Sequence, residues 1–141
     1  VRMYRRNWDD YFLEIAKVVS TRSTCPRASV GAVIVKDRHI ISTGYNGSAP
    51  GEPHCIDVGC NIQRTLEVRD GKEVYHDHCQ RAIHAETNSV AQAAKFGIPT
   101  FGTTLYYWDS LNRPANSCIK CWQVMTASGI LHIIGRSGII L

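Results

Sequence analysis

The feature that most constrains this chain is a His-Ala-Glu triplet, His84 to Glu86, followed by a Cys-x-x-Cys pair at Cys118 and Cys121. An imidazole and two thiolates are zinc ligands, and a Cys-x-x-Cys pair in the first turn of a helix presents both sulfurs to one ion. Because 34 residues separate His84 from Cys118, the fold must bring two distant segments together. Three protein ligands leave one tetrahedral position for water, which is typical of a catalytic zinc.

Glu86 lies two residues after the first of these ligands. It is unsuited to be a fourth ligand if water is to bind, and its predicted role is that of a general acid and base for a reacting ring and its amine. Taken singly, a Cys-x-x-Cys pair also fits a redox pair or half of a structural zinc site, and a lone His at a helix start fits a cap or a core residue. The combination H-x-E with a later C-x-x-C is typical of zinc-dependent nucleobase deaminases.

Composition narrows the class of protein. At 141 residues and 44% hydrophobic content, we expect one domain, residues 1–141. A formal charge of +4 suits a small anionic ligand and falls short of a strong polymer-binding charge, although it also fits an ordinary soluble surface. The longest aliphatic stretch, Val30 to Val35, is of strand length, and we expect neither a secretory signal nor a membrane partner. Six cysteines in a cytoplasmic protein favour metal binding over disulfides.

The pattern of apolar residues predicts alternating helices and strands. Helices are expected from Trp8, with Asn7 as cap, and from Cys118 to Ala127, with Ser117 or Asn116 as cap. Between them the composition turns helical from Cys79 to Phe96, and the His-Ala-Glu triplet opens this second helix. Strands are expected at residues 30–35 and 39–43, which should form a hairpin, and at 103–108 and 130–134. Such alternation favours an α/β fold with a layered sheet.

The region from Gly44 to about His78 shows no sustained periodicity and is predicted to be a long functional loop. A connection of this length inside a compact domain usually carries a site or a metal clip. The residues available for such a clip are Cys55, Cys60, His78 and Cys79.

The chain resembles the deoxycytidylate (dCMP) deaminase family, and most closely its bacterial late-competence and bacteriophage branch. The triplet and the Cys-x-x-Cys pair mark only the superfamily, whereas G-Y-N-G upstream and H-C-x-R-x-I-H-A-E mark this branch. The segments that carry the resemblance are Ser23–Arg27, Ser29–Ile34, Gly44–Gly47, His54–Cys55, Asp57, Gly59–Cys60, His78–Cys79, Arg81, Ile83–Glu86, Lys95–Thr100 and Cys118–Cys121.

The resemblance implies hydrolytic conversion of dCMP to dUMP and ammonia, which supplies thymidylate synthesis. It implies a three-layer α/β/α cytidine-deaminase-like fold around a mixed sheet of four to five strands. By the same resemblance His84, Cys118 and Cys121 hold zinc and Glu86 is the catalytic proton shuttle. The substrate-binding residues that it implies are Asn46 for the deoxyribose hydroxyl, the Ala85 backbone amide for the pyrimidine carbonyl, and Arg27 with Ser29 for the phosphate.

Phage-type relatives carry a second, structural zinc, and matching positions here are Cys25, Cys55, His78 and Cys79, with Cys60 or His54 as replacements for one of them. This metal would tie the long loop to the first strand and to the catalytic helix.

Three features of the sequence depart from the family pattern. Ser117 replaces the usual Pro before the first Cys, the 108–116 link is longer, and many relatives continue with a further strand and helix.

Two alternatives stay open: a deaminase of another cytosine-type substrate, either a nucleoside or single-stranded nucleic acid, and a non-catalytic zinc-stapled DNA-uptake module. The retained Glu86 speaks against the module, and the modest charge speaks against a nucleic-acid partner. Family likeness also implies a homo-oligomer, a hexamer, with dCTP (with Mg2+) and dTTP as allosteric effectors. The expected location is the cytoplasm, which is the host's if the chain is phage-encoded.

Overall fold

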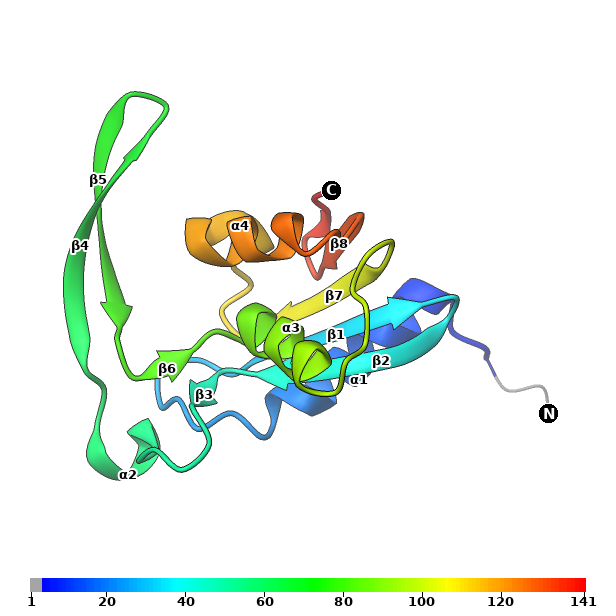
Figure 1. Cartoon of the computed structure of the whole chain (residues 1–141), viewed down its shortest axis with the longest axis horizontal. Coiled ribbons are helices and arrows are strands. Elements are labelled where there is room, and N and C mark those ends of the chain that lie inside the picture. Colours follow the sequence, from blue (N-terminus) through cyan, green and yellow to red (C-terminus); the bar gives the residue numbers. More distant parts are fainter. Residues whose placement is uncertain (1–3) are drawn as a thin grey trace.

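The computed structural model describes residues 4–141 and is built around a five-stranded mixed sheet (Figure 1). The strand order is β2-β1-β7-β8-β9. The strands are β1 (Val30–Lys36), β2 (His39–Tyr45), β7 (Thr104–Asp109), β8 (His132–Gly135) and β9 (Gly138–Ile139). Only β7 and β8 run parallel, and the other neighbouring pairs of this sheet are antiparallel.

Helices cover both faces of the sheet. Helix α1 (Trp8–Ser20) packs against β1 and β7 on one face, while α3 (Ala85–Lys95) and α4 (Ile119–Ala127) lie on the other (Figure 1). Two apolar clusters fill the two interfaces, one around Phe12 and Val33 and the other around Leu105, Met125 and Ile133. The expected three-layer α/β/α architecture with a mixed sheet is confirmed.

The first helix and the first hairpin form as their sequences predict. The Asn7 side chain caps α1 by accepting a hydrogen bond from the Asp10 backbone N–H at 2.8 Å. Strands β1 and β2 are joined at Asp37 and Arg38, whose φ values of 50° and 63° suit the left-handed two-residue turns that match strand twist.

The prediction of a long loop from Gly44 to about His78 is wrong, because most of this region forms strands and a short helix. Strands β4 (Ile62–Arg69) and β5 (Lys72–Cys79) form an antiparallel hairpin that projects from the body of the five-stranded sheet (Figure 1). Its turn, Asp70 and Gly71, is an Asp-Gly pair with positive φ, a strong local hairpin signal. Three shorter elements precede and follow the hairpin: β3 (Gly47–Ser48), α2 (Cys55–Val58) and β6 (Ala82–Ile83).

The alternation of apolar and polar residues does not indicate this hairpin, because most of its apolar residues do not face a core. Leu66, Val68 and Tyr75 are 50%, 63% and 62% exposed on its outer face, whereas Glu67 and His76 alternate onto the half-buried inner face. Among residues 4–141, no helix has the length and apolar character needed to cross a bilayer.

Gly44 allows α3 to pack closely on β2. A Cβ atom at this position would lie 2.6 Å from the Ala85 carbonyl oxygen and would also overlap the Ser89 backbone nitrogen. Both obstacles are backbone atoms, so the helix itself would have to move. We expect Gly44→Ala to destabilise the protein by about 1–3 kcal/mol and to lower its catalytic activity, since α3 begins beside His84 and Glu86. Thermal unfolding checks this, with Gly135→Ala as the comparison, because a Cβ at Gly135 would meet only ordinary van der Waals contacts of 3.7 Å or more.

Candidate metal centre and active-site cavity

Two helix N-termini converge on one cluster of ligand atoms. His84 is the N-cap of α3 and Cys118 is the N-cap of α4, with Cys121 one turn further. One ligand atom from each of the three residues lies within 4.8 Å of the others, and His84 Nδ1 is 3.2 Å from Cys121 Sγ. Both helices direct the partial positive charge of their first turns toward this point, which favours thiolate ligands.

Cys118 itself caps α4, in place of the expected Ser117 or Asn116. Its sulfur accepts a hydrogen bond from the Cys121 backbone N–H at 3.4 Å, while residues Ala115–Ser117 form a short 3-10 turn, η1. Hydrogen bonds from the Cys121 thiol and from His84 lower the pKa of Cys118 to about 3, despite its partial burial. A thiolate beside an imidazole and a second sulfur is a donor set that fits zinc.

Glu86 lies in the first turn of α3 and is only 3% exposed. Burial raises its pKa above the ordinary range of a carboxyl group, an effect that the charge of His84 partly opposes. A carboxyl group whose protonated form is favoured in this way can both take up and release a proton.

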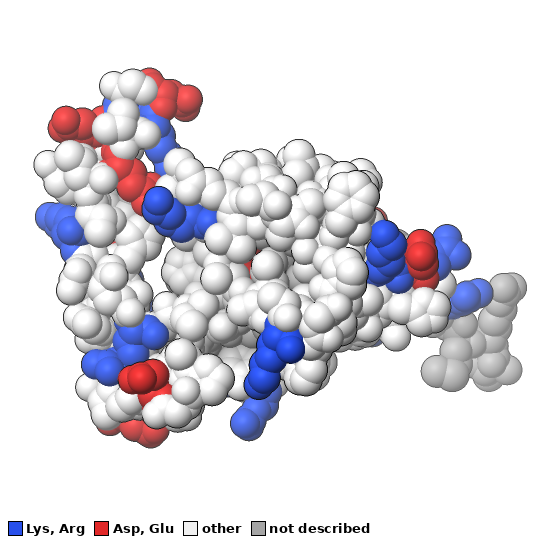
Figure 2. Space-filling model, viewed as in Figure 1, with Lys and Arg blue, Asp and Glu red and all other residues white. Residues whose placement is uncertain are grey.

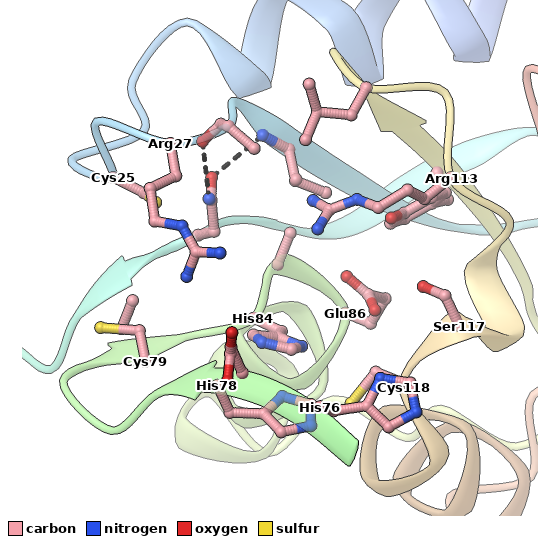
Figure 3. A pocket seen from close by; sticks show the side chains of 18 residues that line it. Cys25, Arg27, His76, His78, Cys79, His84, Glu86, Arg113, Ser117 and Cys118 are labelled. Atoms are coloured by element: carbon pink, nitrogen blue, oxygen red, sulfur yellow. Dashed lines mark hydrogen bonds between the residues drawn. The ribbon is translucent and has the colours of Figure 1, made fainter. Parts of the chain in front are cut away.

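His84, Cys118 and Glu86 line a cavity of about 400 Å3 (Figure 3). Its walls come from the loop before β1, the end of β5, the start of α3 and the link between β7 and α4. The volume falls within the range typical of small-molecule sites. The remaining lining residues are Cys25, Arg27, Ala28, Val30, Asn46, His76, Asp77, His78, Cys79, Ala82, Ala85, Tyr107, Leu111, Arg113 and Ser117.

Three of the four expected substrate-binding residues line this cavity. Ala85 is fully buried in the first turn of α3, where backbone N–H groups have no intrahelical acceptor. Asn46 accepts a hydrogen bond from the Val30 N–H at 3.0 Å and donates one to the Ala28 carbonyl at 2.9 Å. One of its two amide hydrogens is thus used to hold the loop before β1, and the other is left for a ligand.

Arg27 and Ser29, expected together at the phosphate, are separated by the structure. Arg27 is an exposed residue whose side chain enters the cavity (Figure 3). Ser29 does not line the cavity, and its backbone N–H donates to the Ser110 hydroxyl at 2.9 Å. Strand pairing accounts for this, because Ser29 adjoins the first residue of β1, opposite the end of β7.

Arg113, in the link between β7 and α4, is a cavity residue that the sequence did not single out. Its Nε donates to the Asp109 carboxylate at 2.7 Å, and the Tyr107 hydroxyl donates to the same oxygen at 3.0 Å. The unusual length of the 108–116 segment was the signal that could have drawn attention to it.

The inner face of the β4–β5 hairpin forms a polar wall of the cavity. The carboxylate of Glu67 lies 3.4 Å from His78 Nε2, 3.6 Å from His76 Nε2 and 3.2 Å from Arg69. Arg69 also donates to the Ser117 carbonyl at 2.9 Å, so the hairpin is tied to the residue before Cys118.

A second cluster of sulfurs lies at the base of the hairpin. Ligand atoms of Cys55, Cys60 and Cys79 are within 4.8 Å of one another, and the pKa of Cys55 is raised to about 11 by burial and then by its neighbours Cys79, Cys60 and Cys25. His78, an expected member of this cluster, instead faces Glu67 and the cavity. The reason is strand alternation, since consecutive residues of β5 point to opposite faces.

A histidine and two cysteines beside a buried glutamate are the site of zinc enzymes that deaminate nucleobases. Residues 6–135 match the family described as the cytidine and deoxycytidylate deaminase zinc-binding region. The chain belongs to this family, and the resemblance drawn from its motifs is confirmed.

Individual relatives agree with this assignment. The chain is 41% identical to ComE operon protein 2 of Bacillus subtilis (strain 168), over 91% of this chain and 58% of that protein. It is 34% identical to the deoxycytidylate deaminase of Mycobacterium phage D29, over 94% of this chain and 96% of that protein. The chain thus spans little more than half of the first relative and nearly all of the second.

A solved structure shares the fold. The dCMP deaminase from the cyanophage S-TIM5, in complex with dCMP and dUMP, superposes with a TM-score of 0.67 at 22% identity. The match covers 94% of this chain and 83% of the cyanophage chain.

Proposed function

We propose that this protein catalyses the hydrolytic deamination of dCMP to dUMP and ammonia. The observation that carries the proposal is the buried Glu86 carboxyl beside the His84, Cys118 and Cys121 cluster in one cavity. The names of the phage D29 and cyanophage S-TIM5 relatives point to the same substrate.

His84, Cys118 and Cys121 would hold a zinc ion, which would supply Lewis acidity and lower the pKa of a water molecule. Glu86 takes the proton of the attacking water and delivers it to ring nitrogen N3 as oxygen adds to C4 of cytosine. The same carboxyl group then takes the proton of the new C4 hydroxyl and passes it to the amino group, which leaves as ammonia when the C4–N bond breaks and the C4 carbonyl forms. Burial raises the pKa of Glu86, so the protonated form required midway is accessible.

The chain's other residues orient the pyrimidine and the sugar. The Ala85 backbone N–H donates to the pyrimidine carbonyl, and the free amide hydrogen of Asn46 donates to the deoxyribose hydroxyl. Arg27 approaches the phosphate.

The charge distribution favours a small substrate over a polymer. On the face shown in Figure 2, basic and acidic side chains are interspersed over the β4–β5 hairpin. A single-stranded nucleic acid would require a basic groove with stacking aromatic residues. A non-catalytic module would have no use for a buried carboxyl group beside the metal ligands.

Ammonia release from four substrates tests the proposal. We expect turnover of dCMP to exceed that of deoxycytidine, cytosine and a short single-stranded oligonucleotide by at least about 100-fold in kcat/KM, since a site built for a phosphate loses charge-assisted hydrogen bonds with analogues that lack it. Faster turnover of deoxycytidine or of the oligonucleotide would establish the alternative substrate class. Absence of turnover with all four, in zinc-loaded protein, would refute a cytosine deaminase.

We also propose a second, structural zinc held by Cys25, Cys55, Cys60 and Cys79. Three of these sulfurs are already clustered, and Cys25 is near enough for its charge to affect the pKa of Cys55. Four cysteines would form a closed site that staples α2 and the end of β5 to the loop before β1.

Three further expectations stay predictions from the sequence and its resemblance: the single domain, the homohexamer, and regulation by dCTP with Mg2+ and by dTTP.

A further inference from the structure

Arg113 is held in a fixed position by a buried acid. Asp109 ends β7 and is only 1% exposed, and its second oxygen accepts the Leu111 backbone N–H at 2.9 Å. Its other oxygen binds the Tyr107 hydroxyl and Arg113 Nε. Three donors thus fix the carboxylate, which in turn fixes one nitrogen of the guanidinium group.

The opposite edge of the Arg113 guanidinium is free. Its two terminal nitrogens form no hydrogen bond or ion pair with any of residues 4–141. Figure 3 shows this group turned into the cavity, with Arg27 entering from the other side. Arg27 likewise has no ion pair within the described part of the chain.

The arrangement matches the chemistry of a phosphate monoester. Two guanidinium groups that face one cavity present planar pairs of N–H donors, and such pairs bind phosphate oxygens in a bidentate manner. The ring of a nucleotide would occupy the region beside Glu86 and His84, which leaves the two arginines for its other end.

We propose that Arg113, anchored by Asp109, is a specificity-determining residue that binds the 5′-phosphate of the substrate together with Arg27. This inference rests on the proposed dCMP deaminase activity and assigns to the 108–116 link the selection of a nucleotide over a nucleoside. Ser29, which the structure removes from the cavity, has no part in this clamp.

The test compares dCMP with deoxycytidine, which differ only by the phosphate. We expect Arg113→Ala to reduce kcat/KM for dCMP by about 10- to 100-fold, mainly through KM, because one charge-assisted bidentate contact is lost. Turnover of deoxycytidine should change by less than about 3-fold, because that substrate makes no phosphate contact. The kcat/KM of Arg113→Lys for dCMP should lie between those of wild type and Arg113→Ala, since an ammonium group keeps the charge without the planar pair of donors.

Arg136→Ala is the matched control. Arg136 also binds Asp109, through its backbone carbonyl at 2.9 Å, but it stacks on Trp108 and does not line the cavity. Its loss should leave the ratio of dCMP to deoxycytidine turnover unchanged. An equal loss on both substrates in Arg113→Ala, or no loss, would overturn the inference and leave Arg113 a structural residue.

A failure of the proposed dCMP deaminase activity can be distinguished from a failure of the proposed role of Arg113. If wild-type protein deaminates neither compound, the proposed function is refuted, and equilibrium binding then decides the role of Arg113. Wild type should bind dCMP more tightly than deoxycytidine, and Arg113→Ala should lose that difference. Equal binding of the two compounds by wild type would refute the phosphate clamp.

Discussion

Glu86→Gln is expected to abolish deamination while leaving the protein folded and loaded with metal. The amide has nearly the shape of the carboxyl group but cannot shuttle a proton, and such groups contribute roughly 10²- to 10⁴-fold to rate. Because burial raises the pKa of Glu86, its ionised form is unfavourable in the fold, and the neutral amide should not lower the melting temperature. Steady-state ammonia release, zinc content and thermal unfolding check the three parts of this expectation.

Glu14→Gln on α1 is the control for Glu86→Gln, because it makes the same chemical change on the opposite face of the sheet. It should keep wild-type turnover. Activity of Glu86→Gln within a few-fold of wild type, at full zinc content, would remove the proton-shuttle role and the mechanism built on it.

Cys121→Ser is expected to lose the catalytic metal and all measurable turnover. Cys121 is 3% exposed and its sulfur lies 3.2 Å from His84 Nδ1, so no neighbouring thiol can replace it without rearrangement of α4. Wild-type protein should contain two zinc ions per chain and this variant one. A neutral hydroxyl is a poor zinc ligand compared with thiolate.

Cys60→Ser separates the two metal sites. It should also contain one zinc per chain but should retain turnover, with a lowered melting temperature, because only the staple at the base of the hairpin is weakened. One zinc per chain in wild-type protein would refute the second site. Full zinc content and turnover in Cys121→Ser would refute its assignment to the catalytic cluster.

Elements with strong local signals were predictable from the sequence. The Asn7 cap, the apolar spacing of α1 and the continuous apolar run of β1 gave two elements close to their observed bounds. The β4–β5 hairpin was missed because its inner face is mainly polar and its outer face mixes exposed apolar and charged residues, so neither face shows the apolar alternation of a strand on a core. The Asp70-Gly71 turn was the local signal available for it.

The sequence by itself determined the chemistry proposed for the site. Two thiols at a helix start, an imidazole and a carboxyl two residues away are sufficient to indicate a zinc site with a proton shuttle, because ligand identity and spacing are local properties. Tertiary structure decided which distant side chains share the cavity. Asp109 turns Arg113 inward, and the pairing of β1 with β7 takes Ser29 away from the cavity. Strand alternation turns His78 toward Glu67 and Cys79 toward the sulfurs of Cys55 and Cys60. Such contacts join residues far apart in the chain, and their directions depend on sheet register and packing, which no local pattern encodes.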